Sequence, residues 1–315
     1  MKVSVCMCTY NGENFIQEQL DSIYQQTRQI DELIICDDKS KDRTVEIISE
    51  YIRSKKLEEK WLLYINETNK GYPGNFIYAM SLCTGDIVFL ADQDDIWKEN
   101  KLQIMCDVLE RKKDIKVLAC KFGLIDAAGK KIHTFMAPTQ SNGSMKLKGL
   151  TLADIFYKYE TSGMALAYRN EWYHKKKIQN STVPHDFLIC SMAAEENGLV
   201  QIDAELAYHR RHASNAAKEE YRLKVLLNKE RKLKEINKYM RNLRSLEEES
   251  YLKDPEAQRQ LEVKLESMEE RYQALNSGSR RQVLQNAIRN RKVTRPATVI
   301  CDLMIAGQND DSKDL

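Results

Sequence analysis

A row of acidic and amide side chains follows a short apolar run in this chain. The apolar residues 87–90 and then Ala91 lead into Asp92, Gln93, Asp94 and Asp95. A run of this length predicts a buried strand, so the polar side chains should emerge together at its carboxyl end. Closely spaced carboxylates repel one another unless a cation neutralises them, and oxygen ligands suit Mg²⁺ or Mn²⁺. The block therefore predicts either a metal site or an acidic turn in which Asp94 or Asp95 caps a helix that begins directly after it.

Two further polar clusters stand after apolar runs, at residues 9–12 (TYNG) and 37–42 (DDKSKD). The carboxylates of Asp37 and Asp38 could accept hydrogen bonds from a base or a ribose. Turn formation is the alternative for both, and the better explanation for Asp42. The chain has neither the G-x-G-x-x-G nor the G-x-x-x-x-G-K-[ST] pattern, so a metal and basic side chains would have to neutralise a bound phosphate.

Apolar patterns of strand type and helix type alternate through the first half of the chain. They cover residues 3–8, 15–26, 32–36, 44–54, 61–66, 74–82 and 87–90, with a strand first. This alternation predicts an α/β fold with a mostly parallel central sheet and helices on both faces. The carboxyl ends of parallel strands share one edge of the sheet, where open α/β sheets bind ligands. The three polar clusters should therefore meet.

From residue 216 the chain carries long, highly charged helical patterns with no glycine before Gly278. Apolar residues at a/d spacing, with Asp254-Pro255 as a helix start between them, predict an antiparallel helical hairpin. We therefore predict a first domain over residues 1–215, a helical extension over residues 216–307 and a disordered acidic tail over residues 308–315. The extension is a candidate surface for a homodimer.

The helical segment at residues 280–295 is basic, with interspersed Val283, Leu284, Ile288 and Val293. Such a helix could lie on an anionic membrane surface. The other interpretation is ordinary packing of its apolar stripe on the hairpin or on a second subunit. From sequence alone we favour ordinary packing.

Composition narrows the class of protein. The formal net charge of the 315 residues is only +2, which gives no argument for nucleic-acid binding. No stretch approaches the ~18 apolar residues of a transmembrane helix, and the apolar start is too short for a signal sequence, so we expect a cytoplasmic protein. The eight cysteines form no C-x-x-C pair and mostly lie among apolar neighbours, which favours buried, reduced thiols.

Three segments together resemble the family 2 glycosyltransferases of the GT-A fold. They are residues 4–12 (SVCMCTYNG), 34–44 (IICDDKSKDRT) and 92–97 (DQDDIW), and the last is similar to the D-Q-D-D-x-W motif of the bacterial rhamnosyltransferase-like group. The resemblance covers roughly residues 1–215. It implies an inverting enzyme that uses Mn²⁺ or Mg²⁺ and a UDP- or dTDP-sugar donor. The implied acceptor is a saccharide or lipid-linked saccharide of bacterial surface polysaccharide synthesis, met at the inner face of the cell membrane.

The resemblance also assigns roles to single residues around the nucleotide sugar. Those at the nucleotide are Thr9, Tyr10 and Asn11 in its pocket, Asp38 at the base, Asn75 beside the sugar nucleotide and Asp92 between ribose and metal. Asp94 would ligate the metal through the diphosphate. Asp95 would do no more than cap the next helix.

The sequence PHDF at residues 184–187 occupies the place of the acidic general base in such enzymes. Asp186 would therefore take the proton of the acceptor hydroxyl, with His185 and Gly163 on the acceptor side. The alternative is that Asp186 only caps a helix that begins at Phe187.

The sequence HRRHASN at residues 209–215 resembles the family pattern Y-R-Q-H-x-x-N. His212 would be a late metal or diphosphate ligand, and Arg210 or Arg211 would neutralise the leaving phosphates. His209 and Arg211 depart from the pattern.

Two other functions fit parts of the sequence. A sugar nucleotidyltransferase has a similar architecture, but its Gly-rich activation loop is missing here. A non-catalytic carbohydrate-binding or assembly protein on the same scaffold would use the helical extension as its partner surface. The intact acidic block and Asp186 favour the enzyme.

Overall fold

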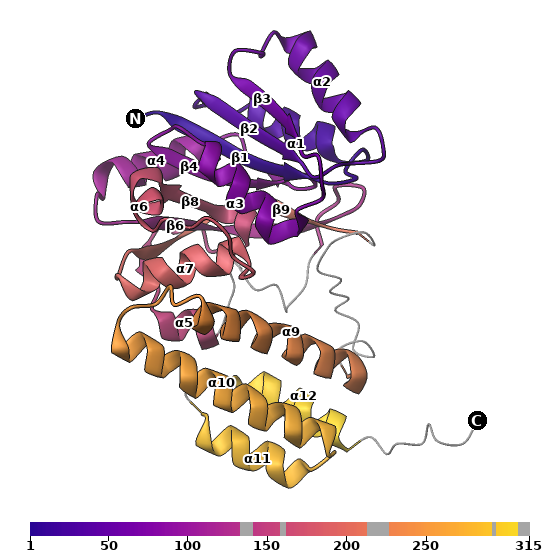
Figure 1. Ribbon diagram of the computed structural model, residues 1–315, viewed down its shortest axis with the longest axis vertical. Helices are drawn as coiled ribbons and strands as arrows, with labels where there is room; N and C mark the ends of the chain where they lie inside the picture. Colours follow the sequence, from indigo (N-terminus) through magenta and orange to yellow (C-terminus); the bar gives the residue numbers. More distant parts are fainter. Residues whose placement is uncertain (133–140, 158–161, 213–226, 292–293, 308–315) are drawn as a thin grey trace, which may run out of the picture. The chain divides into compact units, whose positions relative to one another are not determined.

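The computed structural model describes residues 1–132, 141–157, 162–212, 227–291 and 294–307 (Figure 1). The chain divides into two compact units. Residues 1–151 and 160–215 form one, and residues 152–159 and 216–315 form the other. We call them the sheet unit and the helical unit.

The sheet unit alternates strands and helices, as the sequence predicts. Its elements are β1 (Val3–Thr9), α1 (Ile16–Tyr24), β2 (Glu32–Asp37), α2 (Thr44–Lys55), β3 (Trp61–Ile65), α3 (Gly71–Leu82), β4 (Ile87–Asp92), β5 (Ile96–Trp97), α4 (Lys101–Arg111), β6 (Val117–Asp126), β7 (Leu147–Gly149), the 3₁₀ turn η1 (Gly163–Ala165), β8 (Leu166–Arg169), α6 (Asn170–Lys175), α7 (His185–Glu195) and β9 (Leu199–Arg211).

The described strands form one mixed sheet in the order β3-β2-β1-β4-β8-β6-β9-β5, with β7 also paired to β9. The four strands from β3 to β4 are parallel, whereas β8 runs antiparallel to both of its neighbours. Cys8 lies opposite both Cys36 and Asp92, so the carboxyl ends of β1, β2 and β4 are level. This register brings the loops that follow these strands to the same edge.

Burial on both faces explains the continuous apolar character of the central strands. Every residue of β2 is buried, as are all but one in β1 and in β4. Strands of parallel sheets covered by helices read in this way because neither face meets water. Helix α3 packs on β1 and β2, and α7 packs on β6 and β9.

The helical unit contains α5 (Leu152–Tyr157), α9 (Lys229–Glu248), α10 (Pro255–Asn276), α11 (Arg280–Arg289) and α12 (Pro296–Ala306). The predicted start of α10 is confirmed, because Asp254 is its N-cap and accepts a hydrogen bond from the N–H of Ala257 at 3.3 Å. The a/d residues Ile236 and Leu261 are 2% exposed, in agreement with the predicted packing of α9 on α10. The predicted acidic tail lies outside the described residues.

All eight cysteines are free thiols, and six are buried. Within the described part of the chain, no helix combines the length and apolar character needed to cross a membrane.

Candidate active site

The acidic block lies at the carboxyl end of β4, as the sequence predicts. Asp92 is the last residue of β4, and Asp95 is 1% exposed. No helix begins directly after the block, because residues 96–97 form β5 and pair with β9. The prediction that Asp94 or Asp95 caps such a helix is therefore wrong. Asp95 instead accepts a hydrogen bond from the backbone N–H of Arg210 at 2.9 Å and so ties the block to β9.

Asp94 and His212, both predicted as metal ligands, lie side by side. Oδ2 of Asp94 is 2.9 Å from Nε2 of His212, which comes directly after β9. The His212 ring also packs on Phe15 at the start of α1, with ring centroids 4.3 Å apart. A carboxylate oxygen and an imidazole nitrogen are both suitable ligands for a divalent cation.

The environment of Asp92 strongly disfavours its ionised form. Its pKa is raised to about 7, first by burial and then by the charges of Asp94 and Asp186. Three carboxylates therefore influence one another at this edge of the sheet. A cation bound there would favour the ionised form of Asp92.

Tyr72 connects the two ends of this acidic group, and our sequence reasoning missed it. Its hydroxyl donates a hydrogen bond to Oδ1 of Asp186 at 3.2 Å. Loss of water around the hydroxyl, followed by the charges of Asp186 and Asp92, raises the pKa of Tyr72 well above its ordinary value. The residue as a whole is 46% exposed, so Tyr72 lies at the surface beside Asp186. In the sequence, only the position of Tyr72 directly after Gly71 could have pointed to it as a site residue.

Lys101 is a second residue that the sequence did not single out. It is completely buried, donates from Nζ to the carbonyl of Met164 at 2.5 Å and lies 3.5 Å from the centre of the Trp97 ring. Burial lowers the pKa of Lys101 to about 8, while the charges of Asp95 and Asp92 act in the opposite direction. Lys101 thus supplies positive charge from the protein interior. A lysine at the start of an amphipathic helix gives no hint of this in sequence.

Arg210 supports the block from inside the protein. Its side chain is completely buried, and its guanidinium donates to the carbonyls of Asp94 and Ala127 at 2.8 and 3.0 Å and pairs with Glu18 at 2.5 Å. Because these protein groups engage the guanidinium on three sides, Arg210 acts as a structural support. These contacts argue against the predicted role of Arg210 at the leaving phosphates, and the same role for Arg211 stays a prediction.

The loop after β1 is joined to the acidic block by Gln93. The Gln93 side chain accepts from the N–H of Tyr10 at 2.8 Å and donates to its carbonyl at 3.1 Å. A Cβ at Gly12 would lie 2.3 Å from Oε1 of Gln93, so glycine leaves the space for this contact. Tyr10 itself is 46% exposed, as suits a side chain that contacts a ligand.

The loops after β1 and β2 are also joined. Asn11 adopts a φ of +49°, donates from its N–H to Oγ of Ser40 at 2.9 Å and accepts from the N–H of Lys41 at 2.9 Å. Asp37 is completely buried and accepts from the hydroxyls of Thr9 and Ser40 at 2.8 and 2.5 Å. The three polar clusters therefore meet, as predicted, and turn formation explains Asp37.

Asp38 and Asn75, the predicted contacts of the base and the sugar nucleotide, are 4% and 2% exposed. Asp38 accepts from the N–H groups of Lys70 and Gly71 at 2.7 and 2.9 Å, and from Asn66 at 2.9 Å. Asn75 accepts from Asn66 at 2.8 Å and donates to a backbone carbonyl of β2. Both residues organise the connection between β3 and α3, and their contacts with a nucleotide stay predictions.

Asp186 lies within the first turn of α7, which begins one residue earlier at His185. The expected helix start at Phe187 is therefore two residues too late. Oδ1 of Asp186 accepts from the N–H of Phe187 at 2.8 Å as well as from Tyr72. Among the described residues, the structure shows no hydrogen bond to the second oxygen, Oδ2.

His185 and Gly163 lie against each other beside Asp186. The His185 ring is 2% exposed and stacks on Phe76 with centroids 3.8 Å apart. Burial lowers the pKa of His185 to about 4, so the ring is neutral near pH 7. A Cβ at Gly163 would lie 2.9 Å from Nε2 of His185, so this position has no room for a side chain.

The predicted metal ligands Asp94, His212 and Asp92 lie at one edge of the sheet. Among the residues that the structure describes, no group of three or more His, Cys, Asp or Glu side chains is arranged to hold a metal ion. Asp94 and His212 form a pair, with the raised pKa of Asp92 reporting carboxylate charge nearby. This set fits Mg²⁺ or Mn²⁺ when the oxygens of a bound diphosphate complete the coordination, as is common for Mg²⁺.

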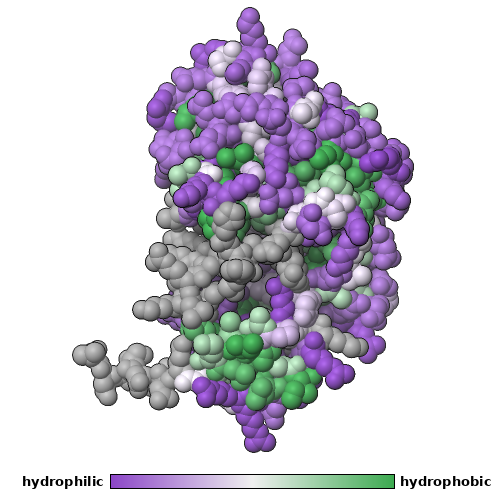
Figure 2. Space-filling view, turned by 180° about the vertical axis from the view of Figure 1, so that it is seen from behind, coloured by the Kyte–Doolittle hydropathy of each residue, from purple (hydrophilic) through white to green (hydrophobic). Residues whose placement is uncertain are grey.

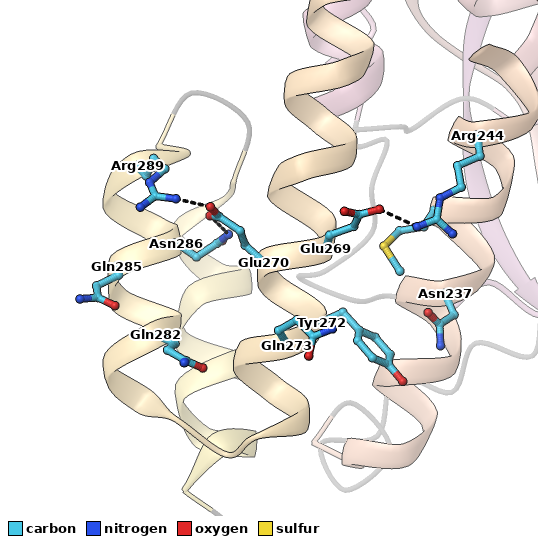
Figure 3. A pocket seen from close by; sticks show the side chains of 11 residues that line it. Asn237, Arg244, Glu269, Glu270, Tyr272, Gln273, Gln282, Gln285, Asn286 and Arg289 are labelled. Atoms are coloured by element: carbon cyan, nitrogen blue, oxygen red, sulfur yellow. Dashed lines mark hydrogen bonds and ion pairs between the residues drawn. The ribbon is translucent and has the colours of Figure 1, made fainter. Parts of the chain in front are cut away.

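A separate cavity of about 730 Å³ lies between α9, α10 and α11 in the helical unit (Figure 3). Five carboxamides line it, namely Asn237, Gln273, Gln282, Gln285 and Asn286. Its charged residues are paired, Arg244 with Glu269 and Arg289 with Glu270. The lining includes no His or Cys, and we therefore place the chemistry at the acidic block.

Comparison with known proteins supports this choice. Residues 4–179 match the sequence profile described as glycosyl transferase family 2. The UDP-Glc:alpha-D-GlcNAc-diphosphoundecaprenol beta-1,3-glucosyltransferase WfgD of Escherichia coli is 34% identical over 107 residues, which are 34% of this chain and 40% of that protein. The dTDP-rhamnosyl transferase RfbG of Shigella flexneri is 27% identical over 221 residues, 66% of this chain and 72% of that protein. In its matches to WfgD and to two further curated relatives, the chain spans only 40% to 66% of the relative's length.

A solved structure confirms the fold. S. aureus TarS in complex with UDP-GlcNAc superimposes with a TM-score of 0.62 at 19% sequence identity, covering 97% of this chain and 90% of that one. At this identity the likeness supports the GT-A architecture alone. The predicted α/β fold with a helical extension is therefore confirmed.

Proposed function

Because this chain belongs to glycosyltransferase family 2, we propose that it transfers a sugar from a nucleotide diphosphate donor to an acceptor hydroxyl with inversion at the anomeric carbon. One observation carries the proposal. The proposed ligands Asp94 and His212 lie 2.9 Å apart, and the charges of Asp94 and Asp186 both raise the pKa of Asp92. This grouping supports a site for the leaving diphosphate beside a base for the acceptor.

We propose a UDP- or dTDP-sugar as the donor. The relatives named above use these nucleotides by their names, UDP-glucose in E. coli and dTDP-rhamnose in Shigella. Tyr10 and Asn11, on the loop tied to the acidic block, are the proposed nucleotide contacts, with Thr9 beneath them. A lipid-linked saccharide of surface polysaccharide synthesis is the proposed acceptor, because the E. coli relative is named for a diphosphoundecaprenol-linked sugar.

Asp94 and His212 would hold Mn²⁺ or Mg²⁺, with Asp92 beside them. A bound divalent cation would neutralise the charge that develops on the leaving diphosphate. Arg211 is the proposed basic partner of the same phosphates. Arg210 and Asp95 keep β9 fixed to the block, so the positions of His212 and Asp94 are set before any ligand binds.

Asp186 is the proposed general base. The acceptor oxygen forms a bond to the anomeric carbon while the bond from that carbon to the diphosphate breaks, and the diphosphate leaves with the bonding electrons. The acceptor proton passes to Asp186, and Oδ2 is the suitable atom because Oδ1 already accepts from Tyr72 and Phe187. Tyr72 and the α7 backbone thereby orient the carboxylate.

The proposal is tested with Asp186→Asn and Asp94→Asn, using Asp114→Asn, at an exposed position after α4, as a matched control. Loss of the base should lower kcat by a factor of about 100 or more while donor binding is retained. Asp94→Asn should weaken donor binding in the presence of Mn²⁺. The assay is nucleotide release from a panel of UDP-, dTDP- and GDP-sugars, with and without Mn²⁺. Full activity of a folded Asp186→Asn protein would rule out the base assignment.

A further inference from the structure

Four large apolar side chains of α11 and α12 are exposed. They are Leu284 and Ile288 on α11, 47% and 72% exposed, and Ile300 and Met304 on α12, 60% and 47% exposed. Within each pair the spacing of four residues places both side chains on one face of the helix. The two helices pack against each other. In the space-filling view, apolar side chains gather on the face of the helical unit that carries α12 (Figures 1 and 2).

This α11–α12 surface, defined by those four residues, is distinct from the faces that hold the helices in place. Val283 and Asn286 of α11 are 5% and 6% exposed, and Ile305 of α12 is completely buried. Asn286 donates to the carbonyl of Ser267 on α10 at 3.1 Å. The helices therefore already have an inward face, so the outward apolar residues are left for another partner.

The charge around the α11–α12 surface is positive. Arg280, Arg281, Arg289 and Arg291 are exposed, whereas residues 280–307 contain a single acidic residue, Asp302. Asp302 is 3% exposed, and both of its oxygens accept hydrogen bonds from Arg271 at 2.7 and 2.9 Å. Of the exposed arginines, Arg289 pairs with Glu270 on α10. Exposed arginines thus flank the exposed apolar residues of α11, Leu284 and Ile288, on both sides in sequence.

This combination discriminates between two partners. A second copy of the chain would bring one arginine-rich surface against another, which costs energy unless acidic groups intervene. Four partly exposed side chains also fall short of the ~800 Å² per partner that stable interfaces bury. An anionic lipid surface supplies phosphates for the arginines and an acyl boundary for the apolar side chains.

We propose that the α11–α12 surface docks on an anionic lipid bilayer. Ile288 and Ile300, the most exposed of the four, enter the boundary between headgroups and acyl chains. The guanidinium groups of Arg280 and Arg281 lie at the level of the lipid phosphates. Docking of this kind depends on both apolar area and basic charge, so each is testable separately.

The test is sedimentation of the full chain with vesicles, without any sugar nucleotide, so that its outcome is independent of glycosyl transfer. The chain should sediment with vesicles of equimolar phosphatidylglycerol and phosphatidylcholine but not with phosphatidylcholine alone. The double variant Ile288→Ser/Ile300→Ser and the double variant Arg280→Glu/Arg281→Glu should each lower the partition coefficient about tenfold or more. Ile65→Ser, which removes a 57% exposed isoleucine from the sheet unit, is the matched control and should bind as the wild type does.

Three results would overturn the proposal. The first is no binding of the wild type to anionic vesicles, and the second is unchanged binding of both double variants. The third is a dimer in light scattering that Ile288→Ser/Ile300→Ser converts to a monomer without any vesicle binding, which would assign the surface to a second copy. Because all four substituted positions are exposed and, in the described part of the chain, only the Arg280 side chain has a hydrogen bond to lose, to the carbonyl of Leu303 at 3.3 Å, thermal unfolding of each variant should stay close to that of the wild type.

Discussion

Asp92 makes the stability of the ligand-free protein depend on pH. Its pKa is raised to about 7 in the folded state, against about 4 in an unfolded chain. Below about pH 4 the carboxyl is protonated in both states and its burial carries no charge penalty. As the pH rises from about 4 to about 7, the carboxyl ionises in the unfolded state but not in the folded state, so the folded state loses stability.

Asp92→Asn should therefore become more stable than the wild type as the pH rises. The difference in the free energy of unfolding should be near zero below about pH 4 and reach about 4 kcal/mol above about pH 7. Chemical denaturation across this range, in a metal chelator, measures it. Added Mn²⁺ should stabilise the wild type more than the variant, because a nearby cation favours the ionised form of Asp92. A difference that does not change with pH would contradict the assignment.

Tyr72 should matter for the proton transfer and not for donor binding. In Tyr72→Phe the ring is retained, but Oδ1 of Asp186 loses the hydrogen bond of 3.2 Å. Since this hydrogen bond orients the carboxylate that takes the acceptor proton, kcat should fall about tenfold at neutral pH. Donor affinity, measured by calorimetry, should stay the same. A loss confined to KM would instead place Tyr72 in substrate binding.

At the scale of residues, patterns found the groups on loops but not those that act through distant contacts. Asp92, Asp94 and His212 could be singled out from sequence because each lies in a recognisable motif. The enclosure of Lys101 beneath the block could not, because it depends on the burial of one helix start against η1. The burial of Arg210 could not be predicted either. Arg210 and Arg211 are adjacent in sequence, and only the structure shows which of them faces the protein interior.

Gly12 determines how closely two loops of the sheet unit approach. In Gly12→Ala the new Cβ would lie 2.3 Å from Oε1 of Gln93, so the Gln93 side chain must move and lose its two hydrogen bonds to Tyr10. We expect a loss of about 1–3 kcal/mol in the free energy of unfolding and weaker nucleotide binding. Gly149→Ala is the matched control, because no atom lies within 4 Å of its added Cβ. Equal stabilities of the two variants would show that the loop adapts without cost.

At the scale of elements, the apolar periodicity predicted each of the first seven helices and strands to within about three residues. The failure came at residues 96–97, where local signals favour a helix after an acidic cap. Ile96 instead pairs with Tyr208, more than a hundred residues away in sequence. A cross-strand partner so distant leaves no local pattern, and tertiary pairing overrides propensity in such a case.

At the scale of the whole molecule, the chain enters the helical unit twice. Residues 152–159 belong to it, although they lie in sequence within the sheet unit. Helix α5 packs on α10, and the carbonyl of Phe156 accepts from the hydroxyl of Tyr239 at 3.5 Å. Leu152 and Ile155 are 5% and 1% exposed. The domain boundary predicted at residue 215 assigns α5 to the first domain, although α5 packs within the helical unit.

A chain shortened to residues 1–215 should therefore fold less stably than the same residues do within the full chain. It would lose α10 while retaining the apolar side chains of α5, of which Ile155 and Phe156 are buried in the full chain. Newly exposed apolar area favours association, so we expect increased dye binding and aggregates in light scattering. Ile155→Ser/Phe156→Ser in the shortened chain should restore a monodisperse protein, whereas the same substitutions in the full chain should cost several kcal/mol of stability. If the unsubstituted shortened chain is monodisperse and binds a UDP- or dTDP-sugar as the full chain does, α5 does not need the helical unit.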